Sequence, residues 1–407
     1  MSRINELIEE FCPDGVEFRN LENCCCILDK FRKPVTKSAR VPGPYPYYGA
    51  NGIQDYVSEY LFDGTFVLVG EDGSVMTEFG KPVVNWATGK IWVNNHAHIV
   101  KESEGVLLRY LFHCLLTVDV HDLIHGNIPK LNQTDFRQIK IPVPPLPVQQ
   151  EIVRILDTFT ELDAELKIEL ETREKQYEYY RDKLLTLDKS TGFMRIDQLM
   201  AKLCPEKISF RRFGEIATIV RGASPRPINQ FITTDSNGIN WIKIGDISPG
   251  SKYVTSTAEK ITIEGAQKSR SVMRGDFILS NSMSFGRPYI LKCDGCIHDG
   301  WLAISNFNRT FLPDFLFHLL NSNEYQRQMK QKASFGGAVQ NLNADIVKNL
   351  LLPTPPLPVQ EEIVRILDRF DTLCNDQTSG LPAEIEARRK QYEYYRDKLL
   401  TFKELEA

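Results

Sequence analysis

The chain has 407 residues, of which 42% are hydrophobic and 25% are charged, and its formal net charge is −4. This composition indicates a globular protein of two or three domains. No run of 18 apolar residues and no signal-peptide pattern is present, which argues against a membrane-spanning or exported protein. We therefore expect a cytoplasmic protein whose nine cysteines are reduced thiols.

The chain opens with a segment that returns near its middle. INELIEEFCPDGVEFRNL at residues 4–21 is matched by IDQLMAKLCPEKISFRRF at residues 196–213, with Cys12-Pro13 aligned to Cys204-Pro205. Each copy predicts a short amphipathic helix that ends in a turn at the Cys-Pro pair. The match is a first sign that one unit is written twice.

A globular segment follows each copy of this opening. Both segments combine short β-type runs, punctuated by Gly and Asn, with a helical run before the end. Both close with a Leu-Asn pair, and the two pairs lie 211 residues apart. The β-type runs are at residues 65–69, 90–93, 238–244 and 276–280, the helical runs are at residues 105–116 and 313–332, and the closing pairs are Leu131-Asn132 and Leu342-Asn343. The pattern predicts an α+β fold with mostly antiparallel sheet.

A long helix is predicted after each globular segment. PPLPVQQEIVRILD at residues 144–157 returns 211 residues later as PPLPVQEEIVRILD, and KQYEYYRDKLLT at residues 175–186 returns 215 residues later. Apolar residues spaced alternately by four and three predict a coiled-coil seam, about 60 Å long in the first copy at 1.5 Å per residue. In the second copy, the four extra residues lie near Ser379-Gly380-Leu381-Pro382, which should break that helix in two.

The repeats predict both a domain plan and a topology. The predicted domains are residues 1–143 and 193–354, with helical regions at residues 144–192 and 355–407. Because the ends of a domain often lie close together, the second helix should start where the first arrives, so the helices should run antiparallel. The predicted fold is α+β, with two mixed, mostly antiparallel-β domains joined by two long antiparallel coiled-coil helices with pseudo-twofold symmetry.

Charge is spread unevenly, and this favours nucleic acid as a ligand. Residues 193–354 carry twenty Lys and Arg against thirteen Asp and Glu, a balance of +7, and basic residues cluster at 30–40 before the aromatic turn PYPYYGANG. Basic loops interleaved with Tyr and Asn suit phosphate anchoring, here expected of Arg32 and Arg226, and base-edge contacts. Ordinary solvated loops are the alternative. The candidate DNA-binding residues are Lys30, Arg32, Lys33, Lys37, Arg40, Tyr47, Tyr48, Asn51, Arg221, Arg226 and Lys243.

The near-identical helical blocks predict a docking surface for a shared partner. Pairing of two helices needs only the apolar seam, and a structural rod is the alternative interpretation. Repetition of the whole KQYEYYRDKLL face would be expected if each copy docks the same partner. The candidate partner-binding residues are Tyr177, Tyr180, Arg181, Leu184, Tyr392, Tyr395, Arg396 and Leu399.

Motifs of catalysis and of metal binding are weak or missing. The sequence has no phosphate-binding loop of the form Gly-x4-Gly-Lys-Ser/Thr, no Asn-Pro-Pro-aromatic motif and no G-x-S-x-G elbow, so we predict a non-catalytic chain without a metal. Cys293 and Cys296 with His298 form a single half-site and are interpreted as buried reduced cysteines. Cys24, Cys25 and Cys26 are interpreted as small core residues on a strand. Packed or polar-paired roles are predicted for His96, His98, His113, His121 and His125, and His96 and His98 are placed on one face of a strand.

The repeated blocks resemble those of the specificity subunits of type I restriction-modification systems. The resemblance covers the full length, and PYPYYGANGIQDYVSEYLFDG at residues 44–64 is similar to part of their target-recognition domains. It implies that each globular segment reads half of a bipartite DNA sequence and that the helices set the gap between the halves. Two methyltransferase subunits would dock on the helices, and two restriction subunits, the translocase-nucleases, would complete the enzyme. S-adenosylmethionine, ATP and magnesium would be bound by those partners.

Two alternatives remain open from the residues alone. One is a scaffold whose globular segments bind proteins or glycans rather than DNA. The other is an enzyme in its own right, against which only the missing motifs stand. A steep dependence of binding on salt would distinguish a DNA-binding protein from the scaffold, and an activity assay of the isolated chain would test the enzyme.

Overall fold

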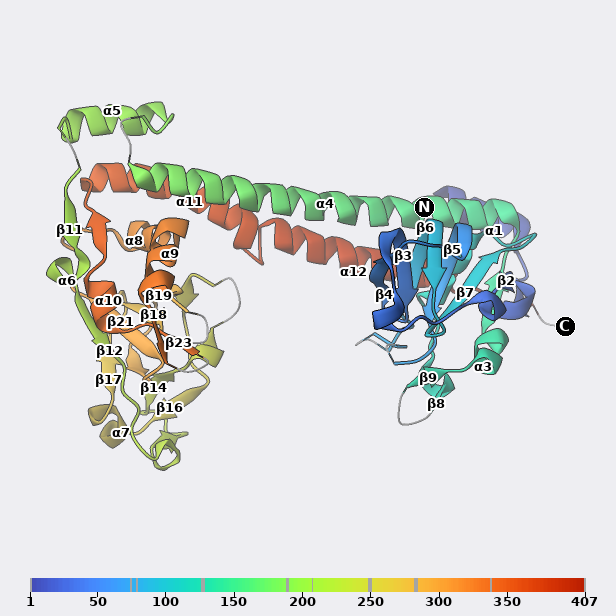
Figure 1. Cartoon of the computed structure of the whole chain (residues 1–407), viewed down its shortest axis with the longest axis horizontal. Helices are drawn as coiled ribbons and strands as arrows, with labels where there is room; N and C mark the ends of the chain where they lie inside the picture. The colour runs from blue at the N-terminus through green and yellow to red at the C-terminus, as the bar shows by residue number, and fades with distance from the viewer. Residues whose placement is uncertain are drawn as a thin grey trace. The chain divides into compact units, whose positions relative to one another are not determined.

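The structure, a computed structural model, divides the chain into two compact units (Figure 1). Unit 1 comprises Met1–Glu165 and Glu386–Ala407, and unit 2 comprises Leu166–Ile385. The structure describes residues 2–73, 75–77, 80–125, 129–187, 190–206, 208–247, 251–281, 285–336 and 339–405. Within these ranges, no helix is both long and apolar enough to cross a membrane.

Unit 1 is built on one six-stranded sheet of strand order β2-β7-β5-β6-β3-β4. All but one of its pairings are antiparallel; β3 and β6 pair in parallel, with Tyr48 opposite Val93. A second pair, β1 with β10, joins the start of the globular segment to its end. The strands are β1 (Glu17–Asn20), β2 (Cys25–Ile27), β3 (Pro42–Gly49), β4 (Gly52–Val57), β5 (Phe62–Gly70), β6 (Val84–Val93), β7 (Ala97–Glu102), β8 (Ile124–His125), β9 (Lys130–Leu131) and β10 (Lys140–Val143).

The central strand β5 is buried on both faces, and its side chains alternate between two cores. Val67 and Val69 point into the large core of unit 1, whereas Phe66 and Leu68 point into a smaller core on the other face. This is the two-residue period of a strand, and covering both faces explains why the run is almost continuously apolar. The predicted β-type runs at residues 65–69 and 90–93 therefore lie in β5 and β6.

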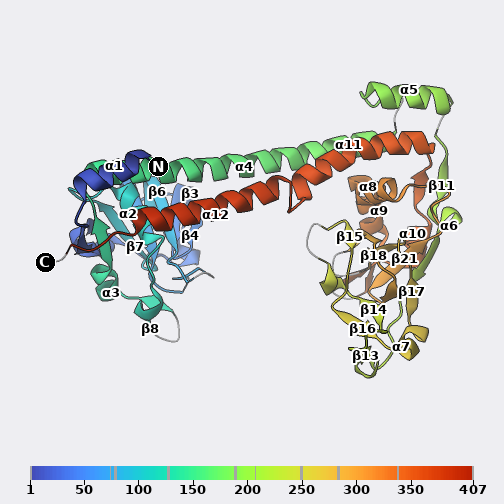
Figure 2. The same ribbon diagram turned by 180° about the vertical axis from the view of Figure 1, so that it is seen from behind.

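Helices cover the large core of unit 1. The N-terminal part of α4 contributes Val148, Ile152 and Leu156, spaced four residues apart, and all three are fully buried. The C-terminal part of α12 lies alongside it (Figure 2), with the ring of Tyr395 stacked 5.5 Å from that of Phe159. The helices of unit 1 are α1 (Ser2–Phe11), 3-10 turns at Leu21–Asn23, Asp29–Phe31, Lys37–Ala39 and His121–Leu123, α2 (Leu108–Leu115), α3 (Gln133–Gln138), and parts of α4 (Leu146–Thr186) and α12 (Leu381–Leu400).

The last residues of the chain are held by the first turn of the globular segment. Val16 donates its amide to the carbonyl of Lys403, and Leu405 donates to the carbonyl of Val16. Gly15 has a φ of +117°, and a Cβ there would lie 2.5 Å from the Lys403 oxygen, so only glycine fits this approach. The first globular segment thus packs near the C-terminus, as the connectivity predicted.

Unit 2 contains two five-stranded sheets, of order β12-β21-β18-β19-β15 and β13-β16-β14-β20-β17. Each sheet has one parallel pairing: β15 pairs with β19 in the first, and β14 pairs with β20 in the second, where Ile242 lies opposite Ile297. The strands are β11 (Phe210–Arg212), β12 (Thr218–Arg221), β13 (Ile232–Thr233), β14 (Ile239–Ile242), β15 (Tyr253–Val254), β16 (Glu259–Ile261), β17 (Arg270–Val272), β18 (Phe277–Ser280), β19 (Pro288–Leu291), β20 (Gly295–Ile297), β21 (Trp301–Ser305), β22 (Ser334–Gly336), β23 (Val339–Asn341) and β24 (Leu351–Pro353).

In unit 2, the C-terminal part of α4 pairs with α11. The ring of Tyr180 stacks on Phe370 at 5.6 Å, and the charges of Arg173 and Glu174, one to two turns earlier on α4, act on Cys374, one turn later on α11. The two helices therefore run antiparallel. The helices of unit 2 are α5 (Met194–Leu203), α6 (Phe213–Ile216), 3-10 turns at Ile228–Gln230 and Ile244–Asp246, α7 (Ile263–Gln267), α8 (Pro313–Asn321), α9 (Asn323–Lys332), α10 (Ala344–Lys348) and α11 (Leu357–Asn375).

The predicted break in the second long helix is confirmed. Helix α11 ends at Asn375 and α12 begins at Leu381, while the carboxylate of Asp376 accepts hydrogen bonds from the amides of Thr378 and Ser379. A Cβ at Gly380 would lie 2.5 Å from the Thr372 carbonyl oxygen, so the turn needs glycine. The α+β prediction with two sheet-rich parts and long helices is confirmed.

Two local predictions were wrong. Cys24 and Cys25 are buried, but Cys26 is exposed because strand β2 turns alternate side chains to opposite faces. His96 and His98 do not share a strand face: β7 begins at Ala97, so His96 lies in the exposed turn before it while His98 is fully buried.

Candidate nucleic-acid interface

Each unit has a cavity at the end of a parallel strand pair, β3 with β6 in unit 1 and β14 with β20 in unit 2. In unit 1, a cavity of about 540 Å³ follows the ends of β3 and β6, and its lining residues are Ala50, Asn51, Gln54, Asp72, Gly73, His96 and Lys130. In unit 2, a cavity of about 750 Å³ follows the ends of β14 and β20. Its lining includes Ser224, Arg226, Trp241, Lys243, Glu259, His298 and Asp299. We call these the unit 1 cavity and the unit 2 cavity; their places in the two units correspond, but their linings differ.

Three of the predicted DNA-binding residues line these cavities. Asn51 lies on the exposed turn between β3 and β4 in unit 1. Arg226 and Lys243 face the unit 2 cavity, and Arg221 stands beside it, with its Nε donating to the carbonyl of Asp299 at 3.1 Å. The structure thus brings together residues that lie up to 22 positions apart on the chain.

Acidic residues and a histidine complete the unit 2 cavity, and sequence reasoning missed them. Arg226 pairs with Asp299 at 3.5 Å and Lys243 with Glu259 at 2.6 Å. The hydrogen bond from Ser224 holds the pKa of Asp299 below its usual value, so this carboxylate is charged. Burial lowers the pKa of His298, whose Nδ1 accepts the amide of Gly300. The cavity therefore presents two cations and two anions around a neutral imidazole.

The tyrosines of the predicted aromatic turn serve the interior instead. Tyr47 is 1% exposed and Tyr48 is 8% exposed, because both faces of β3 are covered: Tyr47 packs in one apolar cluster and Tyr48 in another. The hydroxyl of Tyr47 accepts the amide of Val35 at 3.0 Å, and the guanidinium of Arg40 lies 4.1 Å above its ring. Tyr47 thus fixes the end of the basic segment rather than offering its ring to a base.

The basic segment at residues 30–40 divides into exposed lysines and internally paired arginines. Lys30, Lys33 and Lys37 are exposed. Arg40 pairs with Asp55 at 3.3 Å. Arg32 has an 11% exposed side chain that pairs with Glu71 at 2.5 Å and donates to the Ala97 carbonyl at 2.6 Å. The lysines remain candidates for phosphate contacts, whereas Arg32 has an internal role in place of the expected one.

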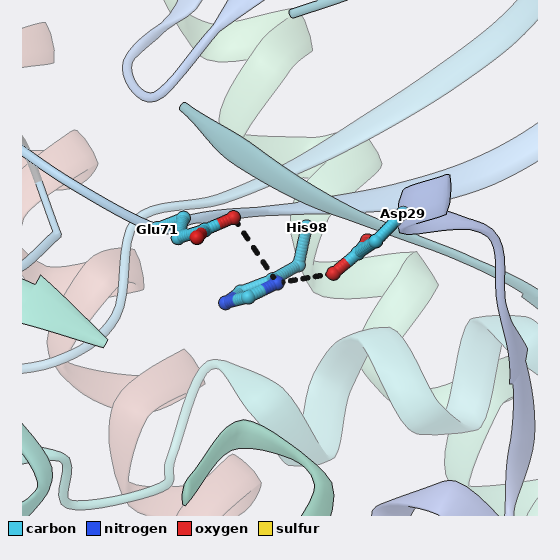
Figure 3. Close-up of side chains that lie close together, drawn as sticks. All are labelled: Asp29, Glu71 and His98. Atoms are coloured by element: carbon cyan, nitrogen blue, oxygen red, sulfur yellow. Dashed lines mark hydrogen bonds and ion pairs between the residues drawn. The ribbon is translucent and has the colours of Figure 1, made fainter. Parts of the chain in front are cut away.

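Asp29, Glu71 and His98 form a buried charged cluster (Figure 3). Arg32 pairs with both of its carboxylates. His98 Nδ1 lies 2.7 Å from an Asp29 oxygen and 3.6 Å from a Glu71 oxygen, and its Nε2 lies 2.9 Å from the Leu131 carbonyl. Both ring nitrogens therefore lie within hydrogen-bond distance of an oxygen acceptor. Burial would raise the pKa of Asp29, but the hydrogen bond and charge of His98, with smaller help from Ile99 and Arg32, leave this pKa below its usual value.

The cluster has the residue types of a metal site, but its oxygens are already occupied. The three candidate ligand atoms lie within 4.8 Å of one another. However, the Asp29 oxygens accept from the Ile99 amide and the Gln133 side chain, and Glu71 is paired with Arg32 and Lys130. A cation would have to displace the guanidinium, so these residues fit an electrostatic clamp better than a metal centre. The clamp ties the start of the basic segment to β7 and β9.

The other metal-like groups have ordinary roles. The thiol of Cys293 points to the carbonyl of Val254 and that of Cys296 to the carbonyl of Ala266, and burial raises the pKa of both. His96 pairs with Asp72, which agrees with the predicted polar-paired role. Among the described residues, no second group of His, Cys, Asp and Glu side chains lies close enough to hold an ion. The side chain of His125 lies outside the described residues.

A Tyr–His–Asp chain of hydrogen bonds recurs in both units. In unit 1, Tyr392 Oη lies 3.4 Å from His113 Nδ1, and His113 Nε2 lies 2.9 Å from an Asp157 oxygen. Burial lowers the pKa of His113 to about 4, so the neutral ring accepts from the tyrosine and donates to the aspartate. In unit 2 the same chain runs from Tyr177 through His318 to Asp368, at 3.0 and 2.8 Å.

The predicted partner-binding residues lie mostly inside the units. Leu184 is fully buried, Leu399 is 4% exposed, and Tyr177 and Arg181 are each 8% exposed. Tyr180 stacks on Phe370, Tyr395 stacks on Phe159, and the guanidinium of Arg396 lies 5.5 Å from the Tyr392 ring. This internal packing explains why most of the face is repeated, whereas Tyr179 and Tyr394, at the same place in the two copies, are 60% and 61% exposed. Docking of a shared partner on this face stays a prediction.

The helical blocks are divided crosswise between the units. Residues 175–186, from the first repeat, belong to unit 2, and residues 390–401, from the second, belong to unit 1. Each unit therefore takes its Tyr from one repeat and its His and Asp from the other. This division agrees with the predicted connectivity, in which the second long helix ends near the first globular segment.

A family model for the type I restriction modification DNA specificity domain matches residues 13–172 and 205–387, most of the chain. The chain belongs to this family. It is 37% identical over 399 residues to a putative type I restriction enzyme specificity subunit of Haemophilus influenzae, covering 95% of this chain and 96% of the relative. It is 32% identical over 318 residues to the specificity subunit of the Escherichia coli type I restriction enzyme EcoR124I/EcoR124II, covering 74% of this chain and 72% of the relative.

The fold of this type I specificity subunit agrees with solved structures. A crystal structure of the S subunit of a type I restriction-modification system from M. genitalium superposes with a TM-score of 0.56 at 15% identity, covering 95% of this chain and 96% of that one. A chain from a study of complex assembly in a type I system gives a TM-score of 0.56 at 17% identity, covering 95% and 98%. The resemblance drawn from the repeated blocks is confirmed.

Proposed function

We propose that this specificity subunit is the non-catalytic reader of a bipartite DNA target, with each unit reading one half through its cavity. The observation that carries the proposal is the pair of cavities at corresponding places in the two units, since equal positions with unlike linings suit two different half-sites. The +7 balance of residues 193–354 and the exposed lysines 30, 33 and 37 supply charge for phosphate contacts. The protein would act in the cytoplasm.

Two methyltransferase subunits would dock on surfaces outside the units' cores. On unit 1, Glu151 pairs with Arg154 at 2.6 Å and with Arg3 at 3.8 Å. On unit 2, Glu362 pairs with Arg365 at 2.5 Å and with Arg195 at 3.3 Å. The arginine side chains are between 47% and 74% exposed, so interior packing does not explain the repetition, and two like surfaces suit two like partners.

The catalytic chemistry would belong to those partners. S-adenosylmethionine would be bound by the methyltransferase subunits, and ATP and magnesium by two restriction subunits that complete the complex. In this chain, the carboxylate oxygens of the charged cluster already accept from Arg32, Gln133 and the Ile99 amide, which supports placing the magnesium elsewhere.

The test is duplex selection with the purified full-length chain at several salt concentrations. A library of duplexes with a randomised core should yield two enriched half-sites separated by a fixed gap. Affinity for the selected duplex should fall steeply with salt, because each phosphate contact releases counterions. If binding to duplexes is insensitive to salt and enriches no sequence, the proposal is wrong and a protein- or glycan-binding scaffold takes its place.

A further inference from the structure

We infer that the two cavities read different base pairs, with Arg226 reading a guanine for unit 2 and Asn51 reading an adenine for unit 1. The inference rests on the proposed function and assigns base classes to the same two sites. It follows from the polar groups that line each cavity, which match the edge of a base better than a phosphate.

The acidic neighbours of Arg226 and Lys243 argue against phosphate anchoring. Asp299 lies 3.5 Å from Arg226, and Glu259 lies 2.6 Å from Lys243, both on the lining of the unit 2 cavity. A phosphate brought to either cation would meet a carboxylate of like charge a few ångströms away. A base edge carries no net charge and presents donors beside acceptors, so a cation paired with an anion matches it.

The order of donor and acceptor in the unit 2 cavity matches a G·C pair. In the major groove, guanine presents the acceptors N7 and O6, which arginine can bind with two hydrogen bonds, and cytosine presents the N4 donor, which a carboxylate can accept. Arg226 and Asp299 supply these two groups side by side. The Arg226 side chain is 82% exposed, and ion pairs at the surface are weak. Arg226 can therefore exchange its contact with Asp299 for one with a base at little cost in free energy.

The segment that carries Arg226 is held by contacts of its neighbours Ser224 and Arg221 with Asp299. Ser224 Oγ donates to Asp299 at 2.7 Å, and Arg221 donates to the Asp299 carbonyl at 3.1 Å. The segment that carries Arg226 is therefore held against Asp299 before DNA arrives. A fixed frame of this kind favours a reader with one preferred base over a loose phosphate contact.

The unit 1 cavity offers amides where the unit 2 cavity offers charges. Its charged groups are committed to the protein: Lys130 pairs with Glu71 of the buried cluster, and His96 pairs with Asp72. Asn51 and Gln54, on the exposed β3–β4 hairpin, remain to face a ligand. Adenine presents N7 as acceptor and N6 as donor, the pattern that an Asn or Gln amide binds with two hydrogen bonds.

Asn51 is a better candidate reader than Gln54. The Gln54 side-chain oxygen accepts from the Asn94 amide at 3.5 Å, so part of its hydrogen-bonding capacity is spent inside the unit. No hydrogen bond to the Asn51 side chain occurs within the described part of the chain, and Asn51 stands at the turn itself. We therefore assign the adenine contact to Asn51.

The experiment is the duplex selection described above, run on the wild-type chain and on Arg226→Gln, with Arg274→Gln as the matched control. Arg274 is exposed in the same unit and does not line the cavity, so its variant removes the same charge elsewhere. Arg226→Gln should lose the guanine preference at one position of one half-site, by roughly 5- to 150-fold, and gain adenine there, because glutamine binds adenine. Arg274→Gln should leave every position unchanged.

A second variant tests the other unit. Asn51→Ala should relax one adenine position in the half-site that Arg226→Gln leaves alone. Uniform weakening on all sequences by Arg226→Gln would make it a phosphate anchor and overturn the inference, as would a half-site without the expected base. A wild-type chain that enriches no sequence would instead contradict the proposed function, so the two failures are distinguishable.

Discussion

Replacing Arg32 by Gln should destabilise unit 1 instead of weakening DNA contacts. The change removes the cation that pairs with Glu71 at 2.5 Å and with Asp29 at 3.5 Å, and those carboxylates are 10% and 3% exposed. Breaking a buried pair by removing one partner costs about 3–5 kcal/mol, because the remaining charges stay buried without their counterion. For a unit of this size, about 2–4 °C is lost per kcal/mol, so the melting temperature of unit 1 should fall by roughly 6–20 °C.

Differential scanning calorimetry measures this effect, and hydrogen exchange assigns it to unit 1 by peptide. Lys30→Gln is the matched control, since it removes the same charge from an exposed neighbour and should leave the melting temperature unchanged. The double variant Arg32→Gln with Glu71→Gln should regain part of the lost melting temperature, because it no longer buries the Glu71 carboxylate without its counterion. An unchanged melting temperature, together with a salt slope of DNA binding reduced by about one, would refute the internal role and restore Arg32 as a phosphate anchor.

The remaining predictions concern residues in or beside the long helices, the first two their packing and the third their exposed arginines. Unit 1 should lose up to about 3 kcal/mol of stability between pH 6.5 and pH 4, because the pKa of His113 falls from its usual 6.5 to about 4 on folding. The contribution of His113 is complete above pH 6.5. In thermal denaturation, a His113→Gln chain should lack this part of the pH dependence. Because Leu184 is fully buried, Leu184→Ala should lower the free energy of unfolding of unit 2 by about 2–5 kcal/mol in chemical denaturation, whereas Tyr179→Ala, at an exposed position, should lower it little. Equal stability of the two variants would show that Leu184 does not pack in the core. Arg154→Gln should reduce bound methyltransferase subunits from two to one in native mass spectrometry, and Arg154→Gln with Arg365→Gln should leave none at low concentration; two bound copies in the double variant would place docking elsewhere.

Much of the architecture could be predicted because it follows from the spacing of apolar residues and from the internal repeats. The alternation of four and three along residues 148–166 predicts a helix wherever it packs, and Gly380 with Pro382 breaks the second helix locally. The crosswise division of the blocks could be predicted only from connectivity: because the second long helix should start where the first one arrives and run antiparallel to it, its last residues should reach the first globular segment. Residues 175–186 and 390–401 are identical, so the blocks themselves do not show which globular segment each one completes.

The cavities were less predictable because their members meet only in the fold. Asp299 lies 73 positions after Arg226 and nothing nearby in the chain marks it as a partner. Arg32 looks like its exposed lysine neighbours, and its burial depends on Glu71, which is 39 positions away. Tyr47 and Tyr48 were predicted at a DNA surface because they follow the basic segment, but each packs into an apolar cluster of unit 1. Local composition therefore did not distinguish the exposed side chains of these loops from the buried ones.

The central claim, that each unit reads one half of a split target, is tested most directly by exchanging residues 214–352 for the equivalent segment of another type I specificity subunit. The exchange carries the whole lining of the unit 2 cavity and leaves the unit 1 cavity untouched. Sequencing of methylated sites in cells that express the chimera with the methyltransferase subunit gives the recognised sequence. We predict that one half-site changes to that of the donor and the other is retained. A change in both halves, or in neither, would contradict the account.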